Sequence, residues 1–475
     1  MATRKSVQGW WPRLATAVGL TVALALPAAP PVGAASLSVT TTNDELNSDG
    51  DCSLREAIRA ANLNVPVDAC PAGGSGLDTI NLPAGTYKLS VGGANEDAAA
   101  TGDLDLTGTL KLQGAGVTAT IIDAQDLDRV FDVLAGATVT LSRLTIQNGT
   151  APDGGGARNA GALVLQNVTV QNNAAVQQCP TSGCKEPIGG RGGGLYNTGT
   201  LSLTNTSLVQ ANSAVGCCFS ALSGANQGGG VYNAGTLLLN DTMLNDNQVY
   251  NDSGPNPTSG GGLYNAGTAT LSKTTLRGNL VQQCCGGGID NLGTLKLTNV
   301  TLASNQALFG HGGGLLNEGT ATLNNVTIAL NSADPNHGCS PACQGGGLNN
   351  AGTLYLTNSL IANNTGAGPD CAGTVISQGY NLIENTNKCT VTGSPLGNIY
   401  GQDPLLAPLQ ANGPTWTFYP RTGSPAIDAG NPAQPGSGGN ACPLLDQRGT
   451  TRPLDGDFNG TRICDIGAVE HHQTT

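Results

Sequence analysis

Seven segments of the chain can be laid over one another without a gap for 20 residues, and each opens with three glycines. Asparagine occupies the sixth position of every copy, and glycine the eighth. Between these positions leucines alternate with small or polar residues, a period of two that indicates strands with one buried face. A unit repeated in this way predicts coils stacked along one axis. The copies begin at Gly154, Gly192, Gly228, Gly260, Gly286, Gly312 and Gly345.

The length of the unit indicates which kind of coil it forms. Successive copies start 26 to 38 residues apart while their shared core stays fixed, so insertions are confined to one turn. A core of ~20–26 residues with short strands and Gly/Asn turns is typical of a β-helix, whereas helical repeats need ~33 or more. Asparagine tolerates the left-handed turn conformation, and stacked side-chain amides can bond from coil to coil. The sequence therefore predicts an all-β fold, a parallel β-helix (solenoid) over residues 79–400.

The segments on either side of this solenoid are expected to close its ends. Residues 36–78 are predicted to form an N-terminal cap with one short helix, and residues 401–475 an irregular C-terminal module that bears disulfides.

Composition excludes several functions. Glycine accounts for 70 of 475 residues, and aromatic residues for only 4%, which does not suit a compact enzyme with a large apolar centre. The formal net charge of −12 makes a nucleic-acid backbone an improbable partner.

Residues 1–35 have the pattern of a secretory signal peptide. Basic residues precede an apolar run from Leu14 to Leu26, and small residues follow it. An uncleaved membrane anchor is the alternative, but the run is shorter than the ~20 residues that span a bilayer. We expect cleavage and a secreted, extracellular or cell-envelope protein whose mature chain has no transmembrane segment.

The even number of cysteines fits export and indicates disulfides. Zinc binding is a weaker alternative because the Cys spacings are poor for zinc and His is scarce. Cys52–Cys70, Cys371–Cys389 and Cys442–Cys464 are predicted to close local loops. Among the close pairs, adjacent cysteines are the harder case because neighbouring Cα atoms lie only ~3.8 Å apart. Bridges between coils, from Cys179/Cys184 to Cys217/Cys218, and a strained ring within each pair are both open. The close pairs are Cys179/Cys184, Cys217/Cys218, Cys284/Cys285 and Cys339/Cys343.

Three motifs resemble known bacterial families. The run from Cys52 to Ile58, CSLREAI, resembles the CSLREA motif of exported proteins. The GGGLYN type of repeat is similar to polymorphic outer-membrane-protein repeats and to pectin-lyase-like right-handed parallel β-helices. GSPAIDAG, DQRG and CDIGAVE, at residues 423–430, 446–449 and 464–470, resemble a choice-of-anchor module. The resemblance implies a surface or secreted protein of a group mostly without known activity. Only five residues follow the module, so we expect release or non-covalent retention.

Motifs of catalysis are scarce in the sequence. No G-x-S-x-G, H-E-x-x-H or P-loop pattern occurs. One calcium-type nonapeptide begins at Gly73, but a single copy lacks the second half of its site. Asp455 opens a stretch like an EF-hand loop, yet its twelfth position is Ile466. The few acids of the repeat region share no column, so we expect no catalytic residue and no bound cofactor there.

One pattern of acids outside the repeats stands out. Asp103-Leu104-Asp105 and Asp126-Leu127-Asp128 lie 23 residues apart, close to one coil. If Leu104 and Leu127 both point inward, all four Asp side chains point outward and stack. Four such carboxylates would bind calcium or raise one another's pKa. The alternative is a solvated acidic face without a metal.

These observations favour a structural or binding protein. We expect an adhesin-like β-helix, secreted or displayed at the cell surface, whose faces or loops contact polysaccharide, a surface protein or envelope components. The alternative is a polysaccharide lyase or glycoside hydrolase of the pectin-lyase-like fold, and the acid pattern would have to carry it.

Overall fold

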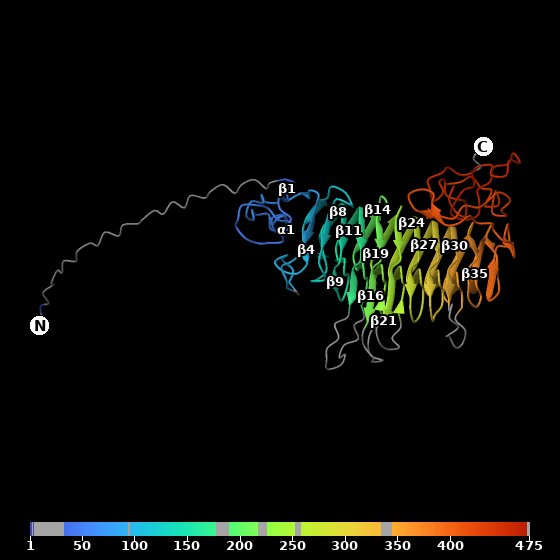
Figure 1. The fold of residues 1–475 in the computed structure, drawn as a ribbon, viewed down its shortest axis with the longest axis horizontal. Coiled ribbons are helices and arrows are strands. Elements are labelled where there is room, and N and C mark those ends of the chain that lie inside the picture. The colour runs from blue at the N-terminus through green and yellow to red at the C-terminus, as the bar shows by residue number, and fades with distance from the viewer. Residues whose placement is uncertain are drawn as a thin grey trace.

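The computed structural model describes residues 33–93, 96–176, 190–216, 226–251, 258–333 and 344–472, together with residues 1 and 3. Figure 1 shows an elongated stack of coils, with α1 (Leu54–Leu63) at the N-terminal end. Strands of successive coils pair in parallel and form one sheet of 29 strands and a second of seven. The predicted all-β parallel β-helix is confirmed.

The strands of the coils lie in three columns, and among the described residues the third column is present only in the middle coils. The first column consists of short strands that end at the sixth-position asparagine of the repeat or its equivalent upstream. They are β4 (Leu104–Leu106), β7 (Phe131–Val133), β10 (Ala157–Asn159), β13 (Leu195–Asn197), β18 (Val231–Asn233), β23 (Leu263–Asn265), β26 (Ile289–Asn291), β29 (Leu315–Asn317) and β32 (Leu348–Asn350).

The second column carries the longest strands, which in most coils bend at the fourteenth position of the repeat. They are β1 (Ser36–Ser38), β2 (Asp78–Asn81), β3 (Gly85–Lys88), β5 (Thr109–Gln113), β6 (Thr120–Asp123), β8 (Thr138–Gln147), β11 (Ala162–Gln171), β14 (Thr200–Thr204), β15 (Leu208–Gln210), β19 (Thr236–Asn240), β20 (Met243–Asn245), β24 (Thr268–Arg277), β27 (Thr294–Ala303), β30 (Thr320–Ala329), β33 (Thr353–Thr357), β34 (Leu360–Ala362), β35 (Cys371–Gly379), β36 (Leu382–Ile383), β37 (Cys389–Gly393) and β38 (Ile399–Tyr400).

The third column is the seven-stranded sheet. The remaining strands form two short pairs, each a separate two-stranded sheet. The column comprises β9 (Thr150–Ala151), β12 (Ala174–Val176), β16 (Ser213–Gly216), β21 (Gln248–Asn251), β25 (Leu280–Val281), β28 (Gln306–Ala307) and β31 (Ser332–Ala333). The short pairs are β17 (Asn226–Gln227) with β22 (Thr258–Ser259), and the antiparallel β39 (Gln410–Ala411) with β40 (Trp416–Thr417).

The leucine alternation forms the core. Leu201 pairs with Leu237 and Leu203 with Leu239 in the next coil, and all four side chains are buried. Parallel pairing begins with β1 on β2, so the coils start earlier than the predicted residue 79.

Two of the asparagine positions form amide ladders through the interior, and a third forms the bend. At the sixth position Asn265 Nδ2 donates to Asn291 Oδ1 at 2.7 Å, and at the twentieth Asn279 Nδ2 donates to Asn305 Oδ1 at 2.8 Å. At the fourteenth position the backbone is left-handed, with φ of 53° at Asn299. The two roles expected for asparagine are therefore both present, at different positions of the repeat.

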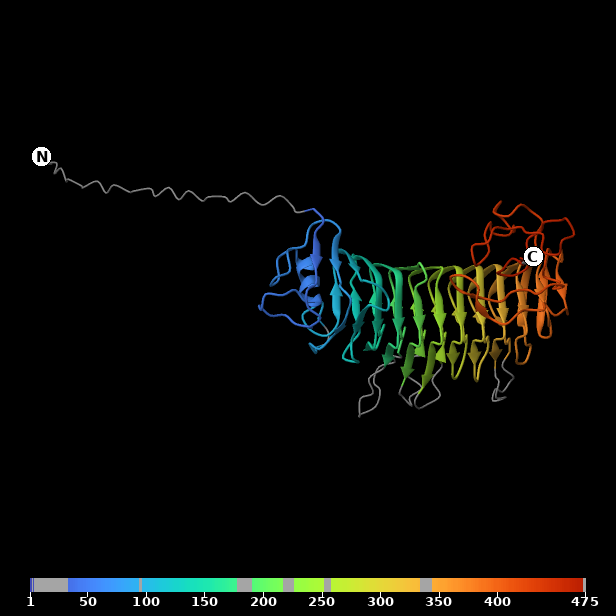
Figure 2. The same cartoon turned by 45° about the horizontal axis from the view of Figure 1, so that its top comes forward.

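The C-terminal module lies along the outside of the last coils (Figure 2). Outward threonines of β24, β27 and β30 bind it: Thr275 Oγ1 donates to the Trp416 carbonyl at 2.6 Å, and Thr301 Oγ1 to Gln447 Oε1 at 2.7 Å. Inside the module, buried Arg452 pairs with buried Glu470 at 2.6 Å. The CDIGAVE segment thus supplies the acid that holds the module together.

Disulfides confirm the three predicted local bridges, Cys52–Cys70, Cys371–Cys389 and Cys442–Cys464. Cys284 is joined to Cys285, so this pair takes the ring within the pair. The remaining predicted cysteines lie outside the described residues: Cys179, Cys184, Cys217, Cys218, Cys339 and Cys343. Across the described ranges, no helix is long and apolar enough to span a bilayer.

Candidate functional site

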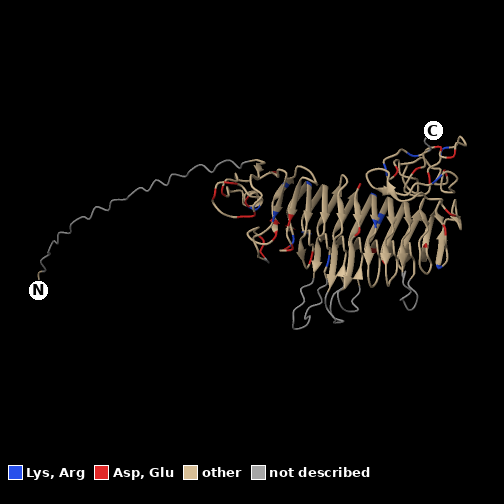
Figure 3. Cartoon of the chain, viewed as in Figure 1, with Lys and Arg blue, Asp and Glu red and all other residues tan. Residues whose placement is uncertain are grey.

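Charged residues are concentrated towards the two ends of the molecule, while the coils between them carry few (Figure 3). Near the N-terminal end they line a cavity of about 580 Å³. We call it the acid–arginine pocket, and its charged residues are Glu96, Asp97, Asp103, Asp128, Arg129, Asp132 and Arg158.

The first-column strands β4, β7 and β10 form the floor of this pocket. Asp105 lies beside Asp132 in the register, and Asp132 beside Arg158. Leu104 and Phe131 occupy the inward positions and are fully buried, so their neighbours along each strand turn to the outer face. The inward–outward alternation along these strands thus places two acids and a guanidinium at the same outward position of three successive coils.

This register differs from the predicted offset of 23 residues. Leu104 pairs with Phe131, an offset of 27, and Leu127 is 43% exposed instead of inward. Asp126 lies in an exposed turn with φ of 59°, where its Oδ1 accepts a hydrogen bond from Thr150 Oγ1 at 3.3 Å. The expected stack of four carboxylates is therefore wrong in its register, and Asp126 does not join the others.

Asp103 and Asp128 do meet at the pocket. Asp103 pairs with Arg129 Nε at 2.8 Å. A Cβ at Gly102, where φ is 61°, would lie 2.6 Å from Asp128 Oδ2, so only glycine lets that carboxylate approach the chain next to Asp103. Burial raises the pKa of Asp103 to about 8, an effect that Arg129 opposes and nearby carboxylates reinforce. Burial therefore favours the protonated form of Asp103, while the ion pair with Arg129 favours the charged form.

Asp105 lies beneath the pocket and is fully buried. Its Oδ2 accepts a hydrogen bond from Ala99 N at 2.6 Å, while its Oδ1 is buried without a partner. Burial raises the pKa of this carboxyl to about 7, and the charges of Glu96 and Asp132 add to the effect. Asp105 is therefore a buried carboxyl next to the pocket and is not one of its lining residues.

Two guanidiniums neutralise part of the acidic charge. Arg158 binds both carboxylate oxygens of Asp132, with Nε to Oδ1 at 2.9 Å, and Arg129 lies 3.8 Å from the same carboxylate. Oxygens of Asp97, Asp105 and Asp132 lie within 4.8 Å of one another, a spacing that suits a cation. That cation would compete with Arg158 and Arg129 for Asp132. Because Asp126 lies apart in its exposed turn, the predicted set of four Asp residues does not form one site, and calcium binding by Asp103, Asp105 and Asp128 stays a prediction.

Helix α1 supports the loop that carries these acids. Arg55 is fully buried, pairs with Asp44 at 2.6 Å, and donates to the carbonyls of Gly102 and Asp103 at 2.9 and 3.2 Å. Asn62 Nδ2 donates to the Asp105 carbonyl at 2.7 Å. Since both side chains come from the CSLREA segment and its continuation, this motif is the structural support of the pocket.

Sequence reasoning did not find Asp132, Arg129 and Arg158 as a group. Arg158 stands in the fifth position of the first repeat, and its register with Asp132 becomes visible only once the coil length upstream is known.

The same outward row continues beyond the pocket into a tyrosine ladder. Arg158 is in register with Tyr196, then Tyr232 and Tyr264 follow on successive coils. Their rings stack with centroids 5.0 and 5.2 Å apart, and the Arg191 guanidinium lies 5.0 Å from the Tyr196 ring. Because each tyrosine ring covers the face of the next, a ligand could contact the ring edges but not the stacked ring faces.

Comparisons with known proteins identify no family for this chain. No family model matches the chain, and no curated protein matches it in sequence. Among solved structures, the crystal structure of pectate lyase Pel9A is similar at 14% identity over 93% of this chain and 97% of that chain, with a TM-score of 0.44. A likeness of this strength carries no argument about the site.

Proposed function

We propose that this is an exported or cell-surface β-helix protein that binds a polysaccharide at the acid–arginine pocket and along the outward row that leaves it. The observation that carries the proposal is the row itself, in which Asp132, Arg158 and Tyr196 stand on successive coils. Carboxylates accept hydrogen bonds from sugar hydroxyls, guanidiniums donate them, and the ~4.8 Å spacing of the coils repeats these groups along an extended chain.

Export is the second part of the proposal and rests on sequence features. The signal-like residues 1–35, the disulfides and the resemblance to CSLREA and choice-of-anchor proteins support it. A surface protein as partner is the alternative to a glycan, and a screen against envelope components would distinguish the two.

Removing a guanidinium from the pocket is expected to weaken glycan binding. The Arg158→Gln variant loses the cation of a side chain that is 41% exposed, so the fold should survive, while affinity should fall about tenfold, the effect of one charged hydrogen bond. A glycan array followed by calorimetry on the best ligand measures this. Lys296→Gln, an exposed cation on β27, is the matched control. Equal affinities of the two variants would contradict a role for the pocket.

One observation favours a second function, cleavage of the bound polysaccharide. Asp103 lines the pocket with its pKa raised to about 8, as a general acid for a glycosidic oxygen requires, and other carboxylates stand near it.

If Asp103 is that acid, turnover should persist below pH 7 and fall as the pH rises through about 8, where the carboxyl loses its proton. Asp103→Asn should lower the rate by about 100-fold or more, as expected for loss of a general acid. Release of reducing ends, with unsaturated products followed in parallel for a lyase, measures it. Binding with no product of either kind would leave the protein a binding protein.

A further inference from the structure

The loop that precedes α1 has the spacing of a calcium loop. Oxygen-bearing side chains stand at alternate positions from Glu45, a glycine is sixth and a glutamate twelfth. This is the ligand pattern of the 12-residue loop in which positions 1, 3 and 5 and a final glutamate bind calcium, with glutamate here in place of the usual aspartate at position 1. The side chains concerned are Glu45, Asn47, Asp49, Asp51 and Glu56, with Gly50 at the turn.

The local structure has the context that this motif requires. Helix α1 starts at Leu54, the tenth position, with Ser53 as its N-cap. Glu56 is fully buried in the first turn, where its carboxylate accepts hydrogen bonds from Ser53 N at 2.9 Å and Asn47 N at 3.1 Å. Gly50 has φ of 96°, a conformation that favours glycine. The helix thus carries the twelfth-position acid back to the loop.

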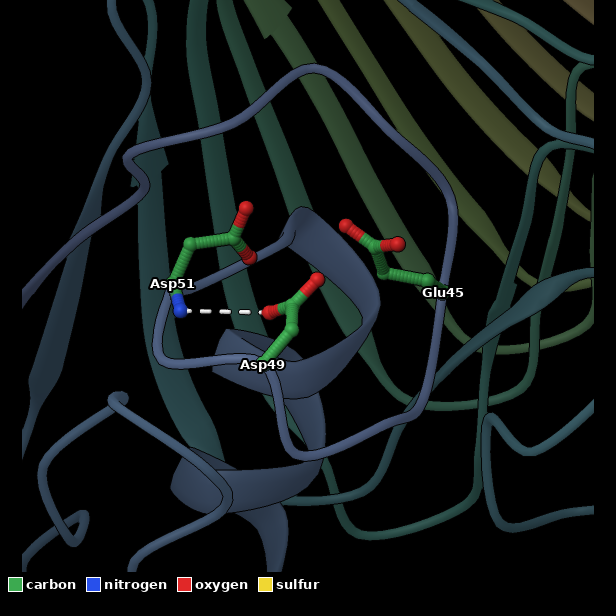
Figure 4. A group of neighbouring side chains, drawn as sticks. All are labelled: Glu45, Asp49 and Asp51. Carbon is green, nitrogen blue, oxygen red and sulfur yellow. Dashed lines mark hydrogen bonds between the residues drawn. The ribbon is translucent and has the colours of Figure 1, made fainter.

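The acids point into the loop. Figure 4 shows the side chains of Glu45, Asp49 and Asp51 converging on its interior, and their carboxylate oxygens lie within 4.8 Å of one another. A second group of oxygens, from Asp51, Glu56 and Asp68, has the same spacing. Glu45 Oε1 and Asp51 Oδ1 are shielded from solvent and have no hydrogen-bond partner. Both residues are half-buried, and shielding an anionic oxygen without a partner is costly, so these two atoms favour a cation bound beside them.

No protein cation balances this charge within the described part of the chain. None of the acids Glu45, Asp49, Asp51, Glu56 and Asp68 forms an ion pair there. The adjacent Arg55 turns away to Asp44. In this respect the loop differs from the acid–arginine pocket, where two guanidiniums hold the carboxylates.

We propose that the Glu45–Glu56 loop binds a calcium ion through the side-chain oxygens of Glu45, Asp49, Asp51 and Glu56. Asn47 is the fifth ligand: its Nδ2 now donates to Glu45 Oε2 at 3.0 Å and Asp49 Oδ2 at 3.1 Å, and turning the amide would present its oxygen instead. An all-oxygen, carboxylate-rich set on a loop suits calcium better than zinc or magnesium.

The ion would act on the pocket through α1. Calcium would link the loop to the first turn of α1 through Glu56. Arg55, the residue before Glu56, donates hydrogen bonds to the carbonyls of Gly102 and Asp103. Binding should therefore stabilise the N-terminal cap and order the floor of the pocket, whatever ligand the pocket takes.

Calorimetric titration with calcium chloride of the chain without residues 1–35 tests the proposal. Asp49→Asn and Glu56→Gln each remove one carboxylate charge. Asp49→Asn keeps an oxygen for Asp51 N, whereas Glu56→Gln keeps an oxygen for only one of the two backbone N–H groups, Ser53 N and Asn47 N, that Glu56 now binds. We expect wild type to bind calcium, and both variants to bind about tenfold more weakly or not at all, because ligand charge sets affinity in such loops. Asp126→Asn, at an exposed acid outside the loop, should bind like wild type.

Three results would overturn the proposal. The first is a wild-type chain that gives no heat with calcium. The second is that the loop variants bind calcium as tightly as Asp126→Asn. The third is that the pocket variant Asp105→Ala plus Asp128→Ala loses calcium binding while the loop variants retain it. Far-UV circular dichroism of each variant shows whether it folds, and calcium should raise Tm in wild type and in Asp126→Asn more than in the loop variants; together these measurements separate lost binding from lost folding.

Discussion

Replacing Arg55 by methionine is expected to lower the free energy of unfolding by about 3–5 kcal/mol, the cost of breaking a buried ion pair from one side. Methionine fills a similar volume but removes the charged partner of Asp44, which keeps its hydrogen bonds from the backbone N–H groups of Ser90 and Val91. It also leaves the carbonyls of Gly102 and Asp103 without the guanidinium donor. Because these carbonyls belong to the loop of the acid–arginine pocket, ligand binding there should be lost together with stability.

Arg59→Met is the matched control for this change. Arg59 stands one turn further along α1, and its recorded hydrogen bond is to the Ala98 carbonyl at 2.8 Å in an exposed setting. It should cost about 1 kcal/mol or less. Thermal and denaturant midpoints measure the stability, and hydrogen exchange of residues 98–107 reports the loop. Similar losses for the two variants, or an unchanged exchange rate in Arg55→Met, would show that Arg55 does not hold this loop.

Sequence alone was sufficient for the coils because every copy of the repeat has the same length up to its twentieth residue. Aligned copies are therefore also paired in register: Leu201 and Leu237 share a column in the alignment and pair in the structure. The asparagine positions were predictable for the same reason, since a residue that recurs once per coil has itself as a neighbour above and below.

The candidate site was less predictable because it lies upstream of the regular repeats. There the spacing of Asp103 and Asp126 suggested a coil of 23 residues, but the turn that contains Asp126 and Leu127 is longer and moves Phe131 into the inward position next to Leu104. The three acids Asp103, Asp105 and Asp128 do gather around the pocket, but Asp128 reaches it from the turn and not from a stacked strand.

The spacing of the proposed calcium loop is visible in the sequence alone, although two features obscure it. Glu45 at its first position departs from the usual aspartate, and the acids overlap the CSLREA segment, which was interpreted as a cap. By contrast, the stretch that begins at Asp455 was noticed for its aspartates although it lacks the acid at position twelve. Of the two stretches, only the one from Glu45 to Glu56 has a glutamate at position twelve and a helix that carries it.

The interior asparagine ladder leads to the second prediction of a large effect. Asn305 is fully buried at the twentieth position of its repeat. Its Oδ1 accepts from Asn279 N at 3.1 Å and Asn279 Nδ2 at 2.8 Å, while its Nδ2 donates to the Leu276 carbonyl at 3.0 Å and Asn331 Oδ1 at 2.9 Å. Each amide therefore joins the coils on both sides of its own.

Asn305→Ala should lower the free energy of unfolding by about 3–5 kcal/mol. The change leaves several buried polar groups without a hydrogen-bond partner, at a cost of about 1–3 kcal/mol each, and the shorter side chain offers them no new partner. Asn205→Ala is the control, since this exposed asparagine holds a left-handed turn with φ of 55° and its replacement should cost about 1–2 kcal/mol. Unfolding midpoints of the two variants decide the matter. If Asn305→Ala cost no more than Asn205→Ala, the asparagines would stabilise the coils through their turns, and the amide ladder would contribute little.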